Sequence, residues 1–248
     1  MNQKLKNATN LYMEGIRDGK ARQAVTKYTG KRYTQHSTGV KDGIEGFVEF
    51  FESFIERCPV RDIKIVRSIV DGQYVFVQAF QDINNSEAKW VTTDLFDTDR
   101  DDKIIEHWDV ISAFESRDES DNDQISGVTE IQDLEATETN KEIVRKLMCD
   151  VMVLGQKSEL ASYIDPENLI IHCASDVGKL DDYVGAYNQV FKIIGQGNFV
   201  VAYSRVLHQD HEIARFDLFR LEKGQIKEIW VNQELVPPKH EWTNGGKF

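Results

Sequence analysis

The stretch DLFDTDRDDKIIEHWD (94–109) has a partial copy later in the chain, DLFRLEKGQIKEIWV (217–231). Both copies start with Asp-Leu-Phe, pass through a polar turn, and end with an isoleucine, a glutamate, one further residue and a tryptophan. Two strand-forming runs around a polar turn are typical of an antiparallel hairpin. A hairpin that occurs twice indicates an internal repeat, in which Trp108 matches Trp230.

Other landmarks keep the same order in both copies. They are Glu106 with Glu228, Asp94 with Asp217, DGQYVFVQ (71–78) with GQGNFVVA (195–202), and KYTGKRYTQHS (27–37) with SYIDPENLIIHCAS (162–175). The last pair aligns His36 with His172. The chain of 248 residues is therefore expected to form two domains, 1–116 and 138–248, which suits the usual domain size of roughly 100–200 residues.

The segment between the copies, 117–137, is predicted to be a solvated linker, because it is acidic and poor in large apolar residues. The net charge is −12, and Glu115 to Glu142 alone contains ten acidic and two basic residues. No basic stripe occurs, so neither nucleic acid nor an anionic membrane is expected as a partner. No apolar run approaches the ~20 residues of a membrane span, and no secretory signal is evident. Three scattered cysteines without a CxxC pair favour reduced thiols and a cytoplasmic location.

Each copy begins with helices and continues with strands. Helical spacing of apolar residues predicts helices at 3–15, 19–28, 42–57 and 140–155, with Asp42 as the cap of the third. The β-branched and aromatic runs IKIVRSIV, YVFVQAF, AKWVTTDLF and IIEHWDVISAF predict an antiparallel meander. This order favours an α+β fold, with two tandem cone-like domains in which N-terminal helices pack on a strongly curved, mostly antiparallel sheet and leave an open-ended cavity.

The second copy is shorter than the first. From His36 to Gly72 there are 36 positions, whereas from His172 to Gly197 there are 25. We therefore expect its third helix or its first long strand to be trimmed. The C-terminal segment VPPKHEWTNGGKF is predicted to be an irregular extension that docks through Trp242 on a sheet.

The first copy resembles the nuclear transport factor 2-like superfamily and, within it, the SnoaL-like group of polyketide cyclases and predicted ester cyclases. The resemblance rests on YTQHSTGVKDGIEGFVEFF (33–51) and TDLFDTDRDDKIIEHWDVISAF (93–114), with Asp97 standing where arginine is usual. It implies a cofactor-independent acid/base lyase or isomerase, such as a cyclase or an aldol-type enzyme, with Asp109 as the general acid/base. It also implies pairing of the two domains as an intramolecular pseudo-dimer, or a homodimer of the chain.

The residues themselves point to the same position. Side chains alternate between the faces of a strand, so His107 and Asp109 share one face with Ile105 and Ile111. An apolar neighbourhood is expected to raise the pKa of a carboxylate and make it a base that can take a proton beside a carbonyl group. Trp108 lies on the opposite face and is interpreted as structural.

Other polar residues extend the candidate site. His36 is a second catalytic candidate that could donate to a substrate oxygen or orient Asp109. Regular alternation turns it away from Tyr33 and Gln35, but a turn at His36 could rotate it, so which of the three reach the cavity stays open. Tyr33 and Gln35, with Trp90 and Asp94 on one face of a later strand, are candidate substrate-binding residues.

Metal and cofactor sites are not expected. A facial triad of His36, His107 and Asp109 is conceivable, but tight ligand spacing is missing. No organic cofactor is expected, because no glycine-rich phosphate loop or nucleophile elbow occurs.

The second copy departs at the two central positions, where Ile229 replaces His107 and Val231 replaces Asp109. Its remaining polar candidates are His172, Tyr203, Arg215 and Asp217. Two functions therefore stay open. The first is an enzyme that acts on a small carbonyl-bearing metabolite in the first domain, for which an Asp109→Asn variant should lose turnover and keep its melting temperature. The second is a non-catalytic small-molecule binder or pseudo-dimeric assembly protein.

Overall fold

The computed structural model describes residues 2–115, 122–164, 168–177 and 179–248. The chain divides into two compact units, which we call the first and second domains. The first domain contains Met1–Ala113 together with Pro237–Phe248, and the second contains Phe114–Val236. The division near residue 114 lies close to the expected boundary. The C-terminal residues, expected to belong to the second domain, belong to the first.

The first domain places its helices before its long strands, as the apolar spacing predicts. Its elements are α1 (Gln3–Asn10), a π-helical turn (Leu11–Arg17), α2 (Ala21–Tyr28), β1 (Thr29–Gln35), α3 (Gly43–Arg57), β2 (Arg61–Asp71), β3 (Tyr74–Ile83), β4 (Ala88–Thr98) and β5 (Ile104–Ala113). Asp42 stands at the N-cap position of α3 but its side chain does not cap that helix. It accepts a hydrogen bond of 2.7 Å from the backbone N–H of Gln35 instead, which ties the start of α3 to the end of β1.

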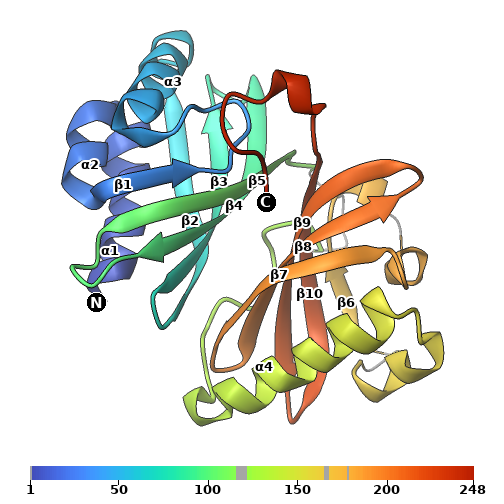
Figure 1. Cartoon of the computed structure of the whole chain (residues 1–248). Helices are drawn as coiled ribbons and strands as arrows, with labels where there is room; N and C mark the ends of the chain where they lie inside the picture. The colour runs from blue at the N-terminus through green and yellow to red at the C-terminus, as the bar shows by residue number, and fades with distance from the viewer. Residues whose placement is uncertain (1, 116–121, 165–167, 178) are drawn as a thin grey trace. The chain divides into compact units, whose positions relative to one another are not determined.

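The strands of the first domain form one sheet in the order β1-β5-β4-β3-β2, in which only the β1–β5 pair is parallel. The helices α1, α2 and α3 lie together beside this sheet (Figure 1). Their apolar faces bury a core with the strands, in which Val25 and Phe47 meet Val75 and Phe96. None of the helices in the described ranges is long and apolar enough to cross a membrane.

The second domain repeats this plan. Its elements are α4 (Thr137–Lys146), a π-helical turn (Leu147–Val153), a 3₁₀ turn (Lys157–Ser162), β6 (Ile170–His172), two short 3₁₀ turns (Ser175–Val177 and Leu180–Tyr183), β7 (Tyr187–Gln196), β8 (Phe199–His208), β9 (His211–Glu222) and β10 (Gln225–Leu235). The sheet order, β6-β10-β9-β8-β7, is that of the first sheet. The α+β fold and the tandem arrangement are thereby confirmed. Short 3₁₀ turns occupy the position of α3, so the helix is the trimmed element.

The hairpin glycines show how the two copies align. Gly72 lies in the turn between β2 and β3, and Gly197 lies in the turn between β7 and β8. Both adopt positive φ angles, +57° and +61°, which only glycine adopts without cost. Gly72 therefore matches Gly197, and the sequence alignment of 71–78 with 195–202 is wrong by one residue.

Much of the acidic segment is not a solvated linker. Residues 122–136, which we call the linker segment, pack on the second domain. The N–H of Gln132 donates to Asn198 Oδ1 at 2.8 Å, and the N–H of Asn198 donates back to the carbonyl of Gln132 at 2.9 Å. Gln124 is 2 % exposed. The remainder of the predicted linker, 117–121, lies outside the described residues.

This packing gives a direct test. A Cβ built on Gly197 would lie 2.0 Å from the carbonyl oxygen of Gln132, whereas one built on Gly72 meets nothing within 4 Å. Gly72→Ala should cost about 1–2 kcal/mol because of its left-handed backbone. Gly197→Ala should cost about 1–3 kcal/mol more, since the linker segment must move away. Urea unfolding of both variants measures the difference, and equal costs would show that the linker segment does not pack on this turn.

Candidate functional site

A cavity of about 330 Å³ lies in the first domain. Its walls come from the helices, the sheet and the loop after β1, and most of them are aromatic or aliphatic. The apolar lining residues are Leu11, Ile16, Val40, Phe47, Phe50, Phe51, Phe54, Trp90, Phe96 and Ile111. Phe50 and Ile111 are 38 % and 41 % exposed, so they mark the opening. The volume lies in the range of small-molecule sites, roughly 300–1,000 Å³.

Polar side chains reach this cavity from β5 and its neighbour β4. Strand alternation directs His107, Asp109 and Ile111 of β5 to the cavity, as the sequence predicted. In the register between the two strands, Asp94 lies directly opposite Asp109, and Phe96 lies opposite His107. The ring of His107 stacks on that of Phe96 at 4.7 Å. The pairing therefore brings two buried carboxylates together, which requires compensating positive charge or protons.

A chain of hydrogen bonds runs from Asp94 to Tyr33. His107 Nε2 lies 2.8 Å from Asp94 Oδ1, and His107 Nδ1 lies 2.9 Å from Gln35 Oε1. Gln35 Nε2 donates to the hydroxyl of Tyr33 at 3.0 Å. On the other side, the hydroxyl of Tyr12 donates to Asp94 Oδ2 at 2.6 Å. All five side chains line the cavity.

The chemistry of the amide fixes the direction of this chain. Because Gln35 uses its NH₂ group toward Tyr33, its Oε1 is the acceptor toward His107, and His107 Nδ1 carries a proton. The Tyr33 hydroxyl accepts from Gln35, and within the described part of the chain no protein acceptor takes its own proton. Burial, with the nearby carboxylates of Asp109 and Asp94, raises the pKa of Tyr33 well above its ordinary value. Tyr33 is therefore a neutral hydrogen-bond donor beside the cavity.

The two facing carboxylates differ in their pKa values. Burial raises the pKa of Asp94 and outweighs its hydrogen bond with His107. Burial also acts to raise the pKa of Asp109, but the ammonium of Lys247, together with His107 and a hydrogen bond from Ser37, holds that pKa below its usual value. The predicted rise in the pKa of Asp109 is therefore wrong. The apolar environment has the expected effect on Asp94, whereas at Asp109 the field of a buried lysine is stronger.

Lys247 is the main residue that the sequence did not reveal. Its side chain is 2 % exposed, and its Nζ lies 2.8 Å from Asp109 Oδ1. It comes from the C-terminal segment, where no strand or helix pattern indicates a position. Tyr12 was also missed, because an aromatic residue at helical spacing looks the same whether it packs in a core or lines a cavity.

His36 is not brought together with the cavity residues. It stacks on Trp108 with ring centroids 4.8 Å apart, and its Nε2 lies 2.9 Å from Glu106 Oε1. Its Nδ1 donates to the carbonyl of Gly246 at 2.8 Å. Regular alternation along β1 continues through His36, so it lies on the other face of the sheet from Gln35. A facial triad of His36, His107 and Asp109 cannot form from this arrangement.

No group of three His, Cys, Asp or Glu side chains among the described residues is arranged to hold a metal ion. The other predicted substrate-binding residues, Tyr33, Gln35, Trp90 and Asp94, all line the cavity.

The corresponding position in the second domain carries a closed ion pair. Ile229 and Val231 are buried, as their alignment with His107 and Asp109 requires. Arg215 Nε donates to Asp217 Oδ1 at 2.8 Å, and the hydroxyl of Tyr187 donates to Asp217 Oδ2 at 2.7 Å. Asp217 thus accepts a hydrogen bond from a tyrosine, as Asp94 does, while an arginine replaces the histidine as its second partner.

The remaining polar candidates of the second domain are engaged in packing. His172 stacks on Trp230 with ring centroids 4.7 Å apart, which repeats the pair of His36 and Trp108. Tyr203 stacks on Phe216 at 4.4 Å. The polar residues that this copy retains therefore serve its own core.

Comparison with known proteins finds a family that matches the first domain. The SnoaL-like domain family matches residues 12–107, which include Tyr33, Gln35, Asp94 and His107 and end just before Asp109. The predicted resemblance is confirmed for this domain. Among the curated proteins, none matches the chain.

Several solved structures are similar to part of the chain. A candidate polyketide cyclase from Bacillus cereus is 18 % identical, covers 44 % of this chain and 74 % of its own, and has a TM-score of 0.40. A candidate SnoaL-like polyketide cyclase from Jannaschia is 22 % identical, with coverages of 44 % and 85 % and a TM-score of 0.38. A candidate isomerase of the SnoaL-like family from Agrobacterium tumefaciens is 14 % identical, with coverages of 46 % and 100 % and a TM-score of 0.39.

Proposed function

We propose that the first domain binds a small carbonyl-bearing metabolite in its cavity and transfers a proton at the carbon next to the carbonyl group. One observation carries this proposal: an ionised carboxylate, Asp109, and a neutral hydroxyl donor, Tyr33, both line one mainly apolar cavity. Proton abstraction beside a carbonyl needs both groups, a base for the proton and a donor for the oxygen that becomes negative.

The proposed step is balanced with these two residues. The C–H bond beside the carbonyl breaks, and its proton moves to the Asp109 carboxylate. The electron pair forms the C=C bond of an enolate, whose oxygen accepts a hydrogen bond from Tyr33. Where a second C=C bond extends the enolate, return of the proton from Asp109 to the far carbon gives an isomer. Attack of the enolate carbon on a second carbonyl gives a ring or an aldol product, whose alkoxide takes the proton from Asp109. No organic cofactor takes part in these steps.

The chain of hydrogen bonds from Asp94 to Tyr33 supports the role of the Tyr33 hydroxyl as a donor. Gln35 accepts from His107 and donates to Tyr33, so the Tyr33 proton is directed away from Gln35. A donor that is oriented before the substrate arrives costs little reorganisation when charge develops, which is the main source of electrostatic catalysis. His107 and Asp94 therefore act through Gln35 in this proposal.

A second function is favoured by a different observation. Both ring nitrogens of His107 and one oxygen of Asp109 already have protein partners. A site whose polar groups are satisfied within the protein can bind an apolar ligand without chemistry. A non-catalytic carrier or sensor of the same class of metabolite is thus the alternative. A cytoplasmic location belongs to both proposals, because Cys58, Cys149 and Cys173 form no disulfide.

Exchange of carbon-bound protons separates the two functions. The full-length protein is incubated in D₂O with 2-tetralone, a bicyclic ketone, and the loss of its α-proton signals is followed by NMR. We expect faster exchange than in buffer at the same pH, and an unchanged rate with Asp101→Asn, a variant of an exposed aspartate of the same domain. Ligand binding, seen as a change in tryptophan fluorescence, without faster exchange would support the carrier. Neither binding nor exchange with a panel of cyclic ketones and β-diketones would refute both.

A further inference from the structure

The last residues of the chain, Pro237–Phe248, form a C-terminal arm on the first domain. The arm follows the loop between β1 and α3. The N–H of Thr243 donates to the carbonyl of Thr38 at 2.9 Å, and Asn244 Nδ2 donates to the carbonyls of Ser37 and Val40 at 2.6 and 2.9 Å. Ser37 and Val40 line the cavity, so the arm fixes a part of its wall.

The end of the arm has a defined conformation. Gly246 has a φ angle of +102°, and a Cβ built on it would lie 2.1 Å from the ring of Trp242. The Trp242 indole donates to the carbonyl of Pro237 at 2.8 Å, so the tryptophan is held within the arm, and its docking on a sheet stays a prediction. This fold of the arm directs the carbonyl of Gly246 to His36 and the side chain of Lys247 to Asp109.

The second domain contains a matching arrangement, supplied by the linker segment. The Nδ1 atom of His172 lies 3.1 Å from the carbonyl oxygen of Asp123, as that of His36 lies 2.8 Å from the carbonyl oxygen of Gly246. The residue after that carbonyl is Gln124 in one domain and Lys247 in the other, and each is 2 % exposed. Gln124 therefore corresponds to Lys247.

The connections show that the two copies exchange these segments. The chain leaves β5 of the first domain and its next residues, from Phe114, belong to the second domain. It leaves β10 of the second domain and its next residues, from Pro237, belong to the first. Each copy thus completes the histidine–tryptophan face of the other with the segment that follows its own last strand.

The correspondence also links Lys247 to Asp109. In the second domain valine replaces the aspartate, at Val231, and glutamine replaces the lysine, at Gln124. The carboxylate and its ammonium partner are therefore both present in one copy and both missing in the other. A buried charge without a partner is costly, so the two residues form one unit.

We propose that the C-terminal arm completes the site of the first domain and that Lys247 is a positioning residue, which holds the Asp109 carboxylate ionised and in place beside the cavity. Lys247 acts through Asp109, because it does not itself line the cavity. The functional consequence rests on the proposed role of Asp109 as base. The second copy then contributes to the site without any chemistry of its own, because the arm follows its last strand, β10.

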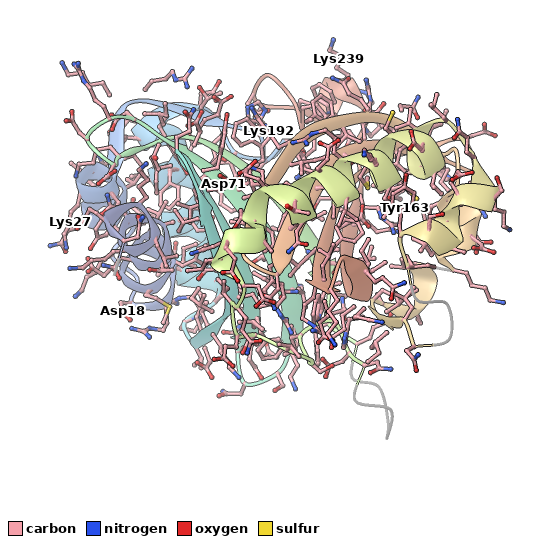
Figure 2. All side chains as sticks on the ribbon, turned by 90° about the horizontal axis from the view of Figure 1, so that it is seen from below. Asp18, Lys27, Asp71, Tyr163, Lys192 and Lys239 are labelled. Atoms are coloured by element: carbon pink, nitrogen blue, oxygen red, sulfur yellow. The ribbon has the colours of Figure 1, made fainter. Side chains whose placement is uncertain are left out.

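The test follows the Asp109 carboxyl group directly. Full-length protein with ¹³Cγ-labelled aspartate is titrated by NMR, and Asp109→Asn identifies the signal. We expect the titration midpoint of Asp109 to rise by about one pH unit or more in Lys247→Met, a tenfold change in proton affinity. Lys239→Met makes the same substitution on an exposed residue of the same arm, which projects outward in Figure 2, and should leave the midpoint unchanged. An unchanged midpoint in Lys247→Met would overturn the proposal.

The same variants give a functional readout. The pH below which proton exchange of 2-tetralone fails should rise in Lys247→Met together with the carboxyl midpoint, which loss of structure alone would not produce. If the wild-type protein exchanges no protons, the proposed function fails, and the NMR titration still decides whether Lys247 controls Asp109.

A double variant covers the case in which Lys247→Met does not fold. Asp109→Val with Lys247→Gln reproduces the residues of the second copy, and it should melt at a higher temperature than either single change. A double variant no more stable than the single changes would show that the two residues are not a unit and would overturn the proposal.

Discussion

The Asp109→Asn variant is expected to exchange the α-protons of a bound ketone at least about 100-fold more slowly than the wild-type protein, since a positioned general base contributes roughly 10²–10⁴-fold. Asparagine has nearly the same shape as aspartate, but its amide cannot take the proton. Binding of the ketone should change much less than the rate, because most of the cavity wall is apolar and unaffected. NMR exchange rates and tryptophan fluorescence titrations measure the two effects separately.

The ion pair with Lys247 affects the stability of Asp109→Asn, so the experiment needs a control in which both charges are removed. The sequence alone suggested that Asp109→Asn would keep its melting temperature. The structure shows that the change removes the carboxylate from a buried ammonium, so we expect the melting temperature to fall. The double variant Asp109→Asn with Lys247→Met removes both charges and should be more stable than the single variant while exchanging protons equally slowly. Exchange at the wild-type rate in either variant would rule out Asp109 as the base.

The fold could be predicted from the sequence because its signals are local and occur twice. Strand alternation places His107 and Asp109 on one face whatever the rest of the chain does. The repeated turn glycines, Gly72 and Gly197, fix both hairpins. The same periodicity places Trp90 and Asp94 on one face, and it places Tyr33 and Gln35 on one face of their strand without showing that this face meets the cavity.

What could not be predicted depends on contacts between distant parts of the chain. Lys247 meets Asp109 across 138 positions, and no local pattern encodes that contact. The lysine also reverses the expected pKa shift of Asp109. Burial raises this pKa and the adjacent ammonium lowers it, so the result depends on how close the ammonium lies. His36 was placed among the candidates on its motif, because alternation separates it from Tyr33 and Gln35 without showing which side faces the cavity.

The linker segment illustrates the same limit. Its acidic composition is that of a solvated connection, yet its backbone forms hydrogen bonds with Asn198 and its Gln124 side chain is buried. A polar segment can be ordered when its main-chain groups find partners on a neighbouring surface, and composition carries no information about that surface. Both exchanged segments are of this kind.

Replacing Lys247 by methionine is expected to lower the unfolding free energy of the first domain by about 3–5 kcal/mol at neutral pH, which is the usual cost of breaking a buried ion pair. The Lys247 side chain is 2 % exposed and its Nζ lies 2.8 Å from Asp109 Oδ1, so little solvent screens the interaction. Urea unfolding followed on the amide signals of β4 and β5 measures the loss in this domain alone.

The loss should depend on pH with a defined sign. In the wild-type protein the pKa of Asp109 is lowered in the folded state, so its contribution to stability is present above the unfolded pKa and is lost as the pH falls through the folded pKa. Without Lys247, burial becomes the largest influence and the folded pKa of Asp109 rises, so folding of the variant is favoured at low pH and opposed as the pH rises through that higher value. The difference between wild type and variant should therefore shrink from pH 7 toward pH 4. The pKa of Asp94 is raised by burial in both proteins, so its own contribution largely cancels in the comparison.

The double variant Asp109→Asn with Lys247→Met sets the baseline for this measurement. It has neither charge, so its stability relative to Asp109→Asn should not follow the titration of a carboxylate at position 109. A difference between wild type and Lys247→Met that stays constant from pH 7 to pH 4 would mean that the methionine change acts through lost packing of the lysine chain. A difference that closes on acidification would show that the charge on Asp109 is the reason for burying a lysine from the far end of the chain.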